Sequence, residues 1–185
     1  MDGRGSGSAG NELAARYLAD ALRAAGLRPG GDEGTFFQSF ALTSGTRLAA
    51  GNALTSTAPA ARQFVVERDW IPHGGSVERD VSAGVAFTGY GVVATEPGYD
   101  DYAGLDVSGK IVLLLDGAPP HLSGDAPGRL EKLVAARRCG AAGVLLVADA
   151  LPAVAATATP VDLASATVTP AVADAFLGPH GTTRA

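Results

Sequence analysis

Two uninterrupted aliphatic runs constrain the fold of this chain more than any other feature of its sequence. The segment "KIVLLLDG" (110–117) holds five consecutive aliphatic residues, and "AGVLLVAD" (142–149) holds a second apolar run. Runs of this length without polar alternation are typical of strands that are covered on both faces. The segment between them, 124–140, has helical apolar spacing and basic residues before its closing glycine. A strand, a helix and a strand in this order predict a βαβ unit with parallel strands and a right-handed crossover.

An amphipathic helix is predicted near the N-terminus, over residues 11–25. Ser8 or Asn11 is suited to cap its start, and Gly26 is suited to end it with a positive φ. Its apolar residues share one face: Leu13, Ala14, Tyr17, Leu18, Ala21, Leu22 and Ala25. A helix with one apolar face is stable when that face is covered, so we expect it to pack against another surface.

Three further strands are predicted from shorter patterns. Residues 35–42, 62–70 and 84–93 are rich in aromatic and β-branched side chains and are bounded by turn-forming residues. Gly89 and Gly91, inside the third of these segments, indicate a bulge or a close approach of two backbones.

The C-terminal part of the chain predicts a loop followed by a short helix. Residues 150–167 are rich in Ala, Pro and Thr and have no apolar period, which is typical of a surface loop. Thr169 is then suited to cap a helix that has Pro170 at its first position and stops at Gly178.

Composition limits the class of protein. With 185 residues, 46% apolar and 18% charged, the chain is long enough to bury a core and is not disordered. A net charge of −5 argues against nucleic-acid binding, and no apolar run is long enough to span a membrane. Residues 1–10 are small and polar, so no signal peptide is predicted in this chain. The fold class we predict is mixed and β-rich α/β.

The adjacent carboxylates Asp100 and Asp101 are the first candidates for chemistry. Neighbouring side chains point to opposite faces of a strand and diverge on a helix, so the pair converges poorly on one proton or one bond. The surrounding "EPGYDDYAGLDVSG" instead suits turns, with an aspartate capping a short helical turn. We therefore favour a structural role over a catalytic one for both residues.

No other motif in the sequence predicts an active site. The three histidines, His73, His121 and His180, lack the spacing of metal ligands. Cys139, the single cysteine, lies at the end of a predicted helix, where the helix dipole disfavours a thiolate. The glycines of "GRGSGSAG" have no preceding strand and no P-loop lysine, and no G-x-S-x-G motif is present.

The central block nevertheless resembles a known family. "GYGVVATEPGYDDYAGLDVSGKIVLLLDGAPP" and then "KLVAARRCGAAGVLLVAD" are similar to the protease-associated (PA) domain that is inserted in co-catalytic zinc aminopeptidases, relatives of glutamate carboxypeptidase II. The segment "GRGSGSAGNELAARYLADALRAAGLRPGG", with the following "FFQSF", resembles the first helix and strand of the peptidase domain of those enzymes. The resemblance implies a helix and strand of a peptidase domain at 1–42 and a PA domain at 43–185.

The resemblance implies a PA-type β-sandwich or open barrel with flanking helices. The residues that match the family motif are Gly89, Tyr90, Gly91, Tyr99, Asp100, Asp101, Tyr102, Gly109 and Lys110. The zinc ligands of the family, a His-x-Asp, a Glu-Glu pair, an Asp and a late His, follow the PA insert. This sequence holds no His-x-Asp and no Glu-Glu, so no catalytic or metal residue is expected in it and two zinc ions are expected in the longer parent enzyme.

The function implied by the resemblance is that of a non-catalytic PA region of a secreted or periplasmic zinc aminopeptidase. Such a region is expected to cover the active-site entrance and to influence access of peptide substrates or contact partner proteins. Its partners would be the remainder of the peptidase domain, peptides, or a second copy bound through the N-terminal helix. The alternatives are a free-standing PA-type module that binds protein or peptide, and a small hydrolase with an unrecognised site.

Overall fold

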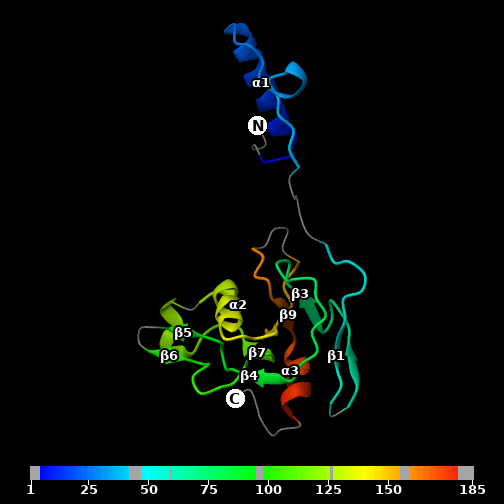
Figure 1. Ribbon diagram of the computed structural model, residues 1–185, viewed down its shortest axis with the longest axis vertical. Helices are drawn as coiled ribbons and strands as arrows, with labels where there is room; N and C mark the ends of the chain where they lie inside the picture. Colours follow the sequence, from blue (N-terminus) through cyan, green and yellow to red (C-terminus); the bar gives the residue numbers. More distant parts are fainter. Residues whose placement is uncertain are drawn as a thin grey trace. The chain divides into compact units, whose positions relative to one another are not determined.

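The chain forms two compact units, Met1–Leu42 and Thr43–Ala185 (Figure 1). The computed structural model describes residues 5–41, 47–58, 60–94, 98–125, 127–154 and 159–178. The two units are treated separately below.

The first unit is built on helix α1 (Ala9–Ala24). Ser8 caps its start, because the Ser8 hydroxyl accepts a hydrogen bond from the backbone N–H of Asn11 at 3.2 Å. Gly26 follows the helix with a φ of 75°, a conformation that favours glycine. The predicted N-terminal helix is therefore confirmed, with its start two residues earlier than expected. A single 3₁₀ turn, η1 (Asp32–Gly34), follows in the same unit.

The strand predicted at 35–42 is wrong over its described part, because residues 35–41 contain no strand. The backbone N–H of Gly31 donates to the carbonyl of Thr35, and that of Asp32 donates to the carbonyl of Phe37, both at 2.7 Å. These bonds close a local turn. They occupy carbonyl groups that a neighbouring strand would need for its own hydrogen bonds. The aromatic spacing of this segment thus misled the sequence analysis.

The second unit contains a five-stranded mixed sheet in the order β3-β9-β8-β7-β4 (Figure 1). Its strands are β3 (Trp70–Pro72), β4 (Val85–Phe87), β7 (Ile111–Leu115), β8 (Gly143–Val147) and β9 (Ala164–Val168). Strands β4, β7, β8 and β9 are parallel, and β3 pairs antiparallel with β9 at one edge. Two small hairpins complete the unit: β1 (Leu54–Ser56) with β2 (Arg62–Phe64), and β5 (Val93–Ala94) with β6 (Tyr99–Asp100).

The predicted βαβ unit is confirmed by strand β7, helix α2 (Arg129–Arg138) and strand β8. The two strands pair in parallel with Val112 opposite Val144 and Leu114 opposite Leu146. The short 3₁₀ helix η2 (Pro120–Asp125) lies between β7 and α2. The last element described is helix α3 (Pro170–Leu177), which begins at the predicted proline and ends before Gly178.

Both faces of the sheet are covered, which explains the uninterrupted apolar runs. One core cluster joins Val112, Leu114, Val144 and Leu146 of the strands to Leu133 and Ala136 of α2. The other joins Leu113, Leu145 and Val147 to Val172, Ala173 and Leu177 of α3, and includes Phe64 of the β1–β2 hairpin. Alternate residues of β7 and β8 therefore point to opposite helices, and the α/β class predicted from the sequence is confirmed.

Three further predictions of the element boundaries need correction. The single strand expected at 62–70 is broken into β2 and β3, because the Asp69 carboxylate accepts the backbone N–H of Val65 at 2.8 Å and closes a turn. The strand expected at 84–93 stops at Phe87. The loop expected at 150–167 contains the start of β9, whose alanines, serine and threonine give no apolar signal.

Within the described residues, no helix is both long and apolar enough to cross a membrane.

Candidate functional site

The residues that carry the sequence resemblance lie along the chain between β4 and the start of β7. Two of them, Tyr99 and Asp100, form strand β6, and the others lie before and after the β5–β6 hairpin. Asp101 is at the centre of this arrangement. Its carboxylate accepts the hydroxyl proton of Tyr99 at 2.6 Å and the backbone N–H of Val92 at 2.9 Å. Its own backbone N–H donates to the carbonyl of Val92 at 2.9 Å. Asp101 therefore connects Val92, just before the β5–β6 hairpin, to Tyr99 in its second strand.

Gly89 and Gly91 make room for this arrangement. Both have a positive φ, 58° and 65°. A Cβ atom on Gly89 would lie 2.9 Å from Oδ1 of Asp101, and a Cβ on Gly91 would lie 2.8 Å from the Leu114 side chain. The atoms closest to these glycines belong to the side chains of Asp101 and Leu114, so the glycines make room for side chains rather than for a second backbone.

Asp100 performs a different task from its neighbour. Its carboxylate accepts the backbone N–H of Tyr102 at 2.8 Å, and its carbonyl accepts that of Ala103 at 3.3 Å. The Asp100 side chain is otherwise exposed, whereas that of Asp101 is half-buried. The two carboxylates thus bind separate turns, and they do not form the convergent pair that shared-proton catalysis requires.

Tyr99 and Tyr102 both keep their hydroxyl protons at neutral pH. The hydrogen bond to Asp101 raises the pKa of Tyr99 to about 12, and burial raises the pKa of Tyr102 to about 12. The Tyr102 hydroxyl and the Thr88 hydroxyl are buried without a hydrogen-bond partner among the described residues. Neither tyrosine is therefore poised to act as a base or a nucleophile near neutral pH.

Gly109 and Lys110 form the turn that leads into β7. The carboxylate of Asp106 accepts the backbone N–H of Ser108 at 3.1 Å, and the Lys110 ammonium donates to the Asp106 carbonyl at 2.7 Å. Gly109 has a φ of 68° and donates its N–H to the carbonyl of Gly140 at 2.9 Å. This part of the motif joins the starts of the two central strands.

Lys132 is a buried charge that the sequence analysis missed. It is only 2% exposed, and its ammonium donates to the carbonyl oxygens of Leu115 at 2.7 Å and Gly117 at 2.5 Å. The Tyr90 ring lies with its centroid 5.8 Å from the same nitrogen. Burial lowers the pKa of Lys132, while the two carbonyl oxygens beside its nitrogen favour the protonated form. Lys132 lies four residues before the buried Ala136 and therefore on the same face of α2. This helical spacing is the sequence signal from which burial of Lys132 could have been predicted.

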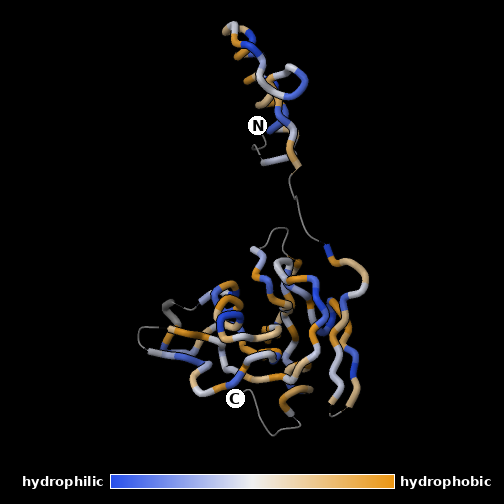
Figure 2. Tube along the Cα trace, viewed as in Figure 1, coloured by the Kyte–Doolittle hydropathy of each residue, from blue (hydrophilic) through white to orange (hydrophobic). Residues whose placement is uncertain are grey.

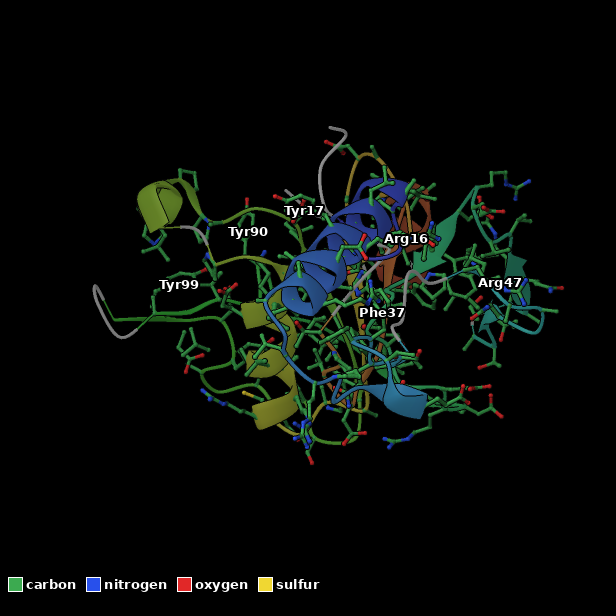
Figure 3. All side chains as sticks on the ribbon, turned by 90° about the horizontal axis from the view of Figure 1, so that it is seen from above. Arg16, Tyr17, Phe37, Arg47, Tyr90 and Tyr99 are labelled. Atoms are coloured by element: carbon green, nitrogen blue, oxygen red, sulfur yellow. The ribbon has the colours of Figure 1, made fainter. Side chains whose placement is uncertain are left out.

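Aromatic rings gather at the β5–β6 end of the second unit, where Figure 3 shows Tyr90 and Tyr99. The ring of Tyr99 meets the ring of His121 edge to face at 5.2 Å, and His121 is exposed. Val93 on β5 is opposite Asp100 in the strand pairing and is 53% exposed. This set, Tyr90, Val93, Tyr99 and His121, is called the aromatic end below.

The remaining candidates for chemistry do not assemble into a catalytic group. His73 is buried in the sheet edge, and His180 lies outside the described residues. Burial raises the pKa of the Cys139 thiol, which keeps it in the less reactive protonated form. In the described part of the chain, no group of three or more His, Cys, Asp or Glu side chains is placed to hold a metal ion.

The first unit presents an exposed apolar surface. Ala19 is its single buried hydrophobic residue among those described. Its large exposed apolar side chains, called the apolar set below, are Leu13, Tyr17, Leu18, Leu22, Leu27, Phe37 and Phe40. Figure 2 shows hydrophobic positions interspersed with hydrophilic ones along α1, and Figure 3 labels Tyr17 and Phe37. Tyr17 is 75% and Phe40 80% exposed, so this unit does not bury its own apolar surface.

Comparison with known proteins gives matches among solved structures. No protein-family model matches the chain, and no curated protein matches it. An aminopeptidase from Aneurinibacillus sp. strain AM-1 superposes with a TM-score of 0.54 at 18% identity, over 95% of this chain and 36% of that one. A zinc aminopeptidase from Bacillus subtilis gives a TM-score of 0.48 at 19% identity, over 92% of this chain and 36% of that one.

The likeness to the Aneurinibacillus aminopeptidase shows the fold. The chain has a mixed α/β fold that occurs as a region of an aminopeptidase structure, and it spans about a third of the length of that protein.

Proposed function

We propose that this chain is a non-catalytic region of a zinc-dependent aminopeptidase. In this proposal residues 43–185 are a PA domain and residues 1–42 are the start of the peptidase domain. The observation that carries the proposal is the superposition of nearly the whole chain on about a third of an aminopeptidase. Part of the matching motif supports it, because Tyr99 and Gly89 both lie against the Asp101 carboxylate.

The apolar set of the first unit supports the same proposal. Side chains of this size stabilise a protein by about 1.5–3 kcal/mol each when they are buried, so a set of them that the first unit does not bury itself is suited to contact a partner surface. In the proposed parent enzyme this surface is the remainder of the peptidase domain, which would also supply the two zinc ions and their ligands. The parent enzyme would be secreted or periplasmic.

The role that we propose for the second unit is to cover the active-site entrance and influence which peptides enter. The aromatic end is the surface we assign to this role, because its Tyr90 and Tyr99 rings are partly exposed, its His121 ring is exposed, and aromatic rings bind extended peptides with little loss of conformational entropy. A free-standing peptide-binding module is the alternative, and it is favoured by one observation. Among the described residues, the second unit forms core clusters from its own side chains on both faces of its sheet.

The first experiment tests whether catalysis resides elsewhere. We expect the chain alone to show no turnover of leucine anilide and no stoichiometric zinc binding by calorimetry. The chain expressed together with the coding sequence that follows it should hydrolyse leucine anilide and lose that activity to a chelator. Turnover by the chain alone, or a following sequence without His-x-Asp and Glu-Glu, would contradict the proposal.

The second experiment tests the role in substrate access, in the parent enzyme. Val93→Glu at the aromatic end should lower kcat/KM for a leucine-initiated decapeptide several-fold and leave kcat/KM for leucine anilide unchanged. Val65→Glu is the matched control, because Val65 is exposed to a similar degree, 47% against 53%, in the turn between β2 and β3. Equal effects of the two variants on the decapeptide would argue against the aromatic end as the contact surface.

A further inference from the structure

His73 is buried at the edge of the five-stranded sheet, immediately after strand β3. It is 7% exposed, and its ring is held by two hydroxyl groups of β9. Nδ1 lies 3.1 Å from the hydroxyl of Ser165, and Nε2 lies 2.8 Å from the hydroxyl of Thr167. These two residues alternate along β9 and therefore share one face of the sheet. Both are themselves buried, so the imidazole has no access to water on this side.

The same residues carry the backbone bonds that attach this edge. The N–H of His73 donates to the carbonyl of Ser165 at 3.0 Å, and the N–H of Ser165 donates to the hydroxyl of Ser76 at 3.0 Å. The N–H of Val77 donates to the carbonyl of Leu163 at 3.3 Å. Strand β3 and residues 73–77, called the edge segment below, are thus fixed to β9 around the His73 ring.

The surroundings of His73 favour the neutral form of its imidazole ring over the protonated form. A neutral ring donates from one nitrogen and accepts a hydroxyl proton at the other, which satisfies both hydroxyl contacts. A protonated ring donates from both nitrogens, so the hydroxyl that had donated to it must accept instead and turn its own proton elsewhere, while the charge remains buried away from water. The groups that β9 and residues 74–76 place around the ring are uncharged. The charged group that acts on the ring is Arg129, at the start of α2, and it is positive.

We propose that His73 is a pH-sensitive latch that holds the edge segment on the sheet at neutral pH and releases it in acid. The inference concerns the second unit alone and does not rest on the proposed function.

The direction and size of the effect follow from proton linkage. Burial, with a smaller contribution from the positive charge of Arg129, lowers the pKa of His73 to about 4 from its ordinary 6.5. The closed state therefore binds the proton more weakly than an open state in which the ring reaches water. The stabilisation is complete above pH 6.5 and is lost as the pH falls toward 4. Between about pH 7 and about pH 5 the closed-to-open ratio should fall roughly twentyfold.

Amide hydrogen exchange on the whole chain tests the latch, with each rate corrected for the intrinsic effect of pH. We expect the protection factors of the His73 and Val77 amides to fall roughly twentyfold from about pH 7 to about pH 5. The amides of Leu113 and Leu145, in the central strands, serve as an internal control and should change far less. His73→Gln keeps a donor and an acceptor on the side chain but cannot titrate, so it should remove the extra loss at Val77.

Three results would overturn the latch: an equal fall at edge and central amides, no fall at His73 and Val77, or an unchanged pH effect in His73→Gln. If His73→Gln does not fold, the NMR titration of the His73 ring in the unaltered protein decides. A ring that remains neutral below pH 5 supports the latch, and a ring that titrates near 6.5 refutes it.

Discussion

At the scale of single residues, Asp100 and Asp101 show how neighbouring carboxylates can have unequal importance. Asp100 holds one backbone N–H of its own turn and is exposed. Asp101 holds the backbone N–H of Val92 and the hydroxyl of Tyr99, and so connects two segments of chain. The sequence favoured a structural role for both residues. It could not distinguish them, because the difference depends on what the fold places opposite each side chain.

We expect Asp101→Ala to lower the free energy of unfolding by about 1–3 kcal/mol, because it leaves the Val92 N–H and the Tyr99 hydroxyl unpaired. Asp100→Ala removes a single exposed turn bond and should cost about 0.5–2 kcal/mol. Urea midpoints of the two variants and the parent measure the difference. A midpoint for Asp101→Ala at or above that of Asp100→Ala would contradict this assignment.

Lys132 gives a second prediction at this scale. Lys132→Met preserves much of the side-chain volume but leaves the carbonyls of Leu115 and Gly117 without their donor, and should lower stability by about 1–3 kcal/mol. Lys110→Met is the matched control, because the Lys110 side chain is much more exposed, and should change stability by less than about 0.5 kcal/mol. Chemical denaturation at neutral pH compares them. Similar losses in both variants would mean that Lys132 does not stabilise the end of β7.

At the scale of elements, the helices and strands with a clear sequence pattern were predicted, and those without one were missed. Strands β7 and β8 were predicted from uninterrupted apolar runs, helices α1 and α2 from helical apolar spacing, and helix α3 from its cap residue, first-turn proline and closing glycine. Strand β9 was missed because it fills a narrow, doubly covered position with small side chains, "ASATV". The strand expected at 35–42 had suitable aromatic residues, but the described residues of its unit offer no strand to pair with it. Propensity alone does not supply a partner.

The close packing of β8 against β9 leads to a prediction at this scale. A Cβ on Gly143 would lie 3.2 Å from the backbone carbonyl of Ala164, and neither strand can move easily because both are central in the sheet. Gly143→Ala should therefore lower stability by about 1–3 kcal/mol. Gly84→Ala, where nothing lies within 4 Å of the added atom, should be nearly neutral. Thermal melting distinguishes the two, and a neutral Gly143→Ala would mean that the strands separate more readily than their packing implies.

At the scale of the whole molecule, the two units differ in how completely they bury their apolar residues. The second unit has two core clusters, whereas the first has a single buried hydrophobic residue, Ala19, among those described. From the sequence, the candidate site could be predicted only as a set of motif residues, without the residues that lie around them. The residues that surround it, Lys132 and His121 among them, come from separate segments and are joined by the fold alone.

Removal of residues 1–42 should leave the urea midpoint of the second unit nearly unchanged and reduce self-association of the chain. The reason is that the apolar set, left exposed here, attracts a second copy when its proper surface is missing. Sedimentation of the full chain, the truncation and a Tyr17→Glu, Leu18→Glu variant measures the effect. A strictly monomeric full chain that loses several kcal/mol on truncation would show that the first unit belongs to the core, against the proposed function.

The pairing of β3 with β9 also determines when this domain can be completed during synthesis. Strand β3 is the first strand of the five-stranded sheet along the chain and β9 is the last, and His73 and Ser165 are 92 residues apart in sequence. A ribosome must therefore release nearly the whole domain before β3 finds its neighbour, and closing so long a loop is slow. Until then β8, with the apolar sequence "GVLLV", is itself an unpaired edge. The nascent chain thus exposes an apolar strand edge until its last strand arrives.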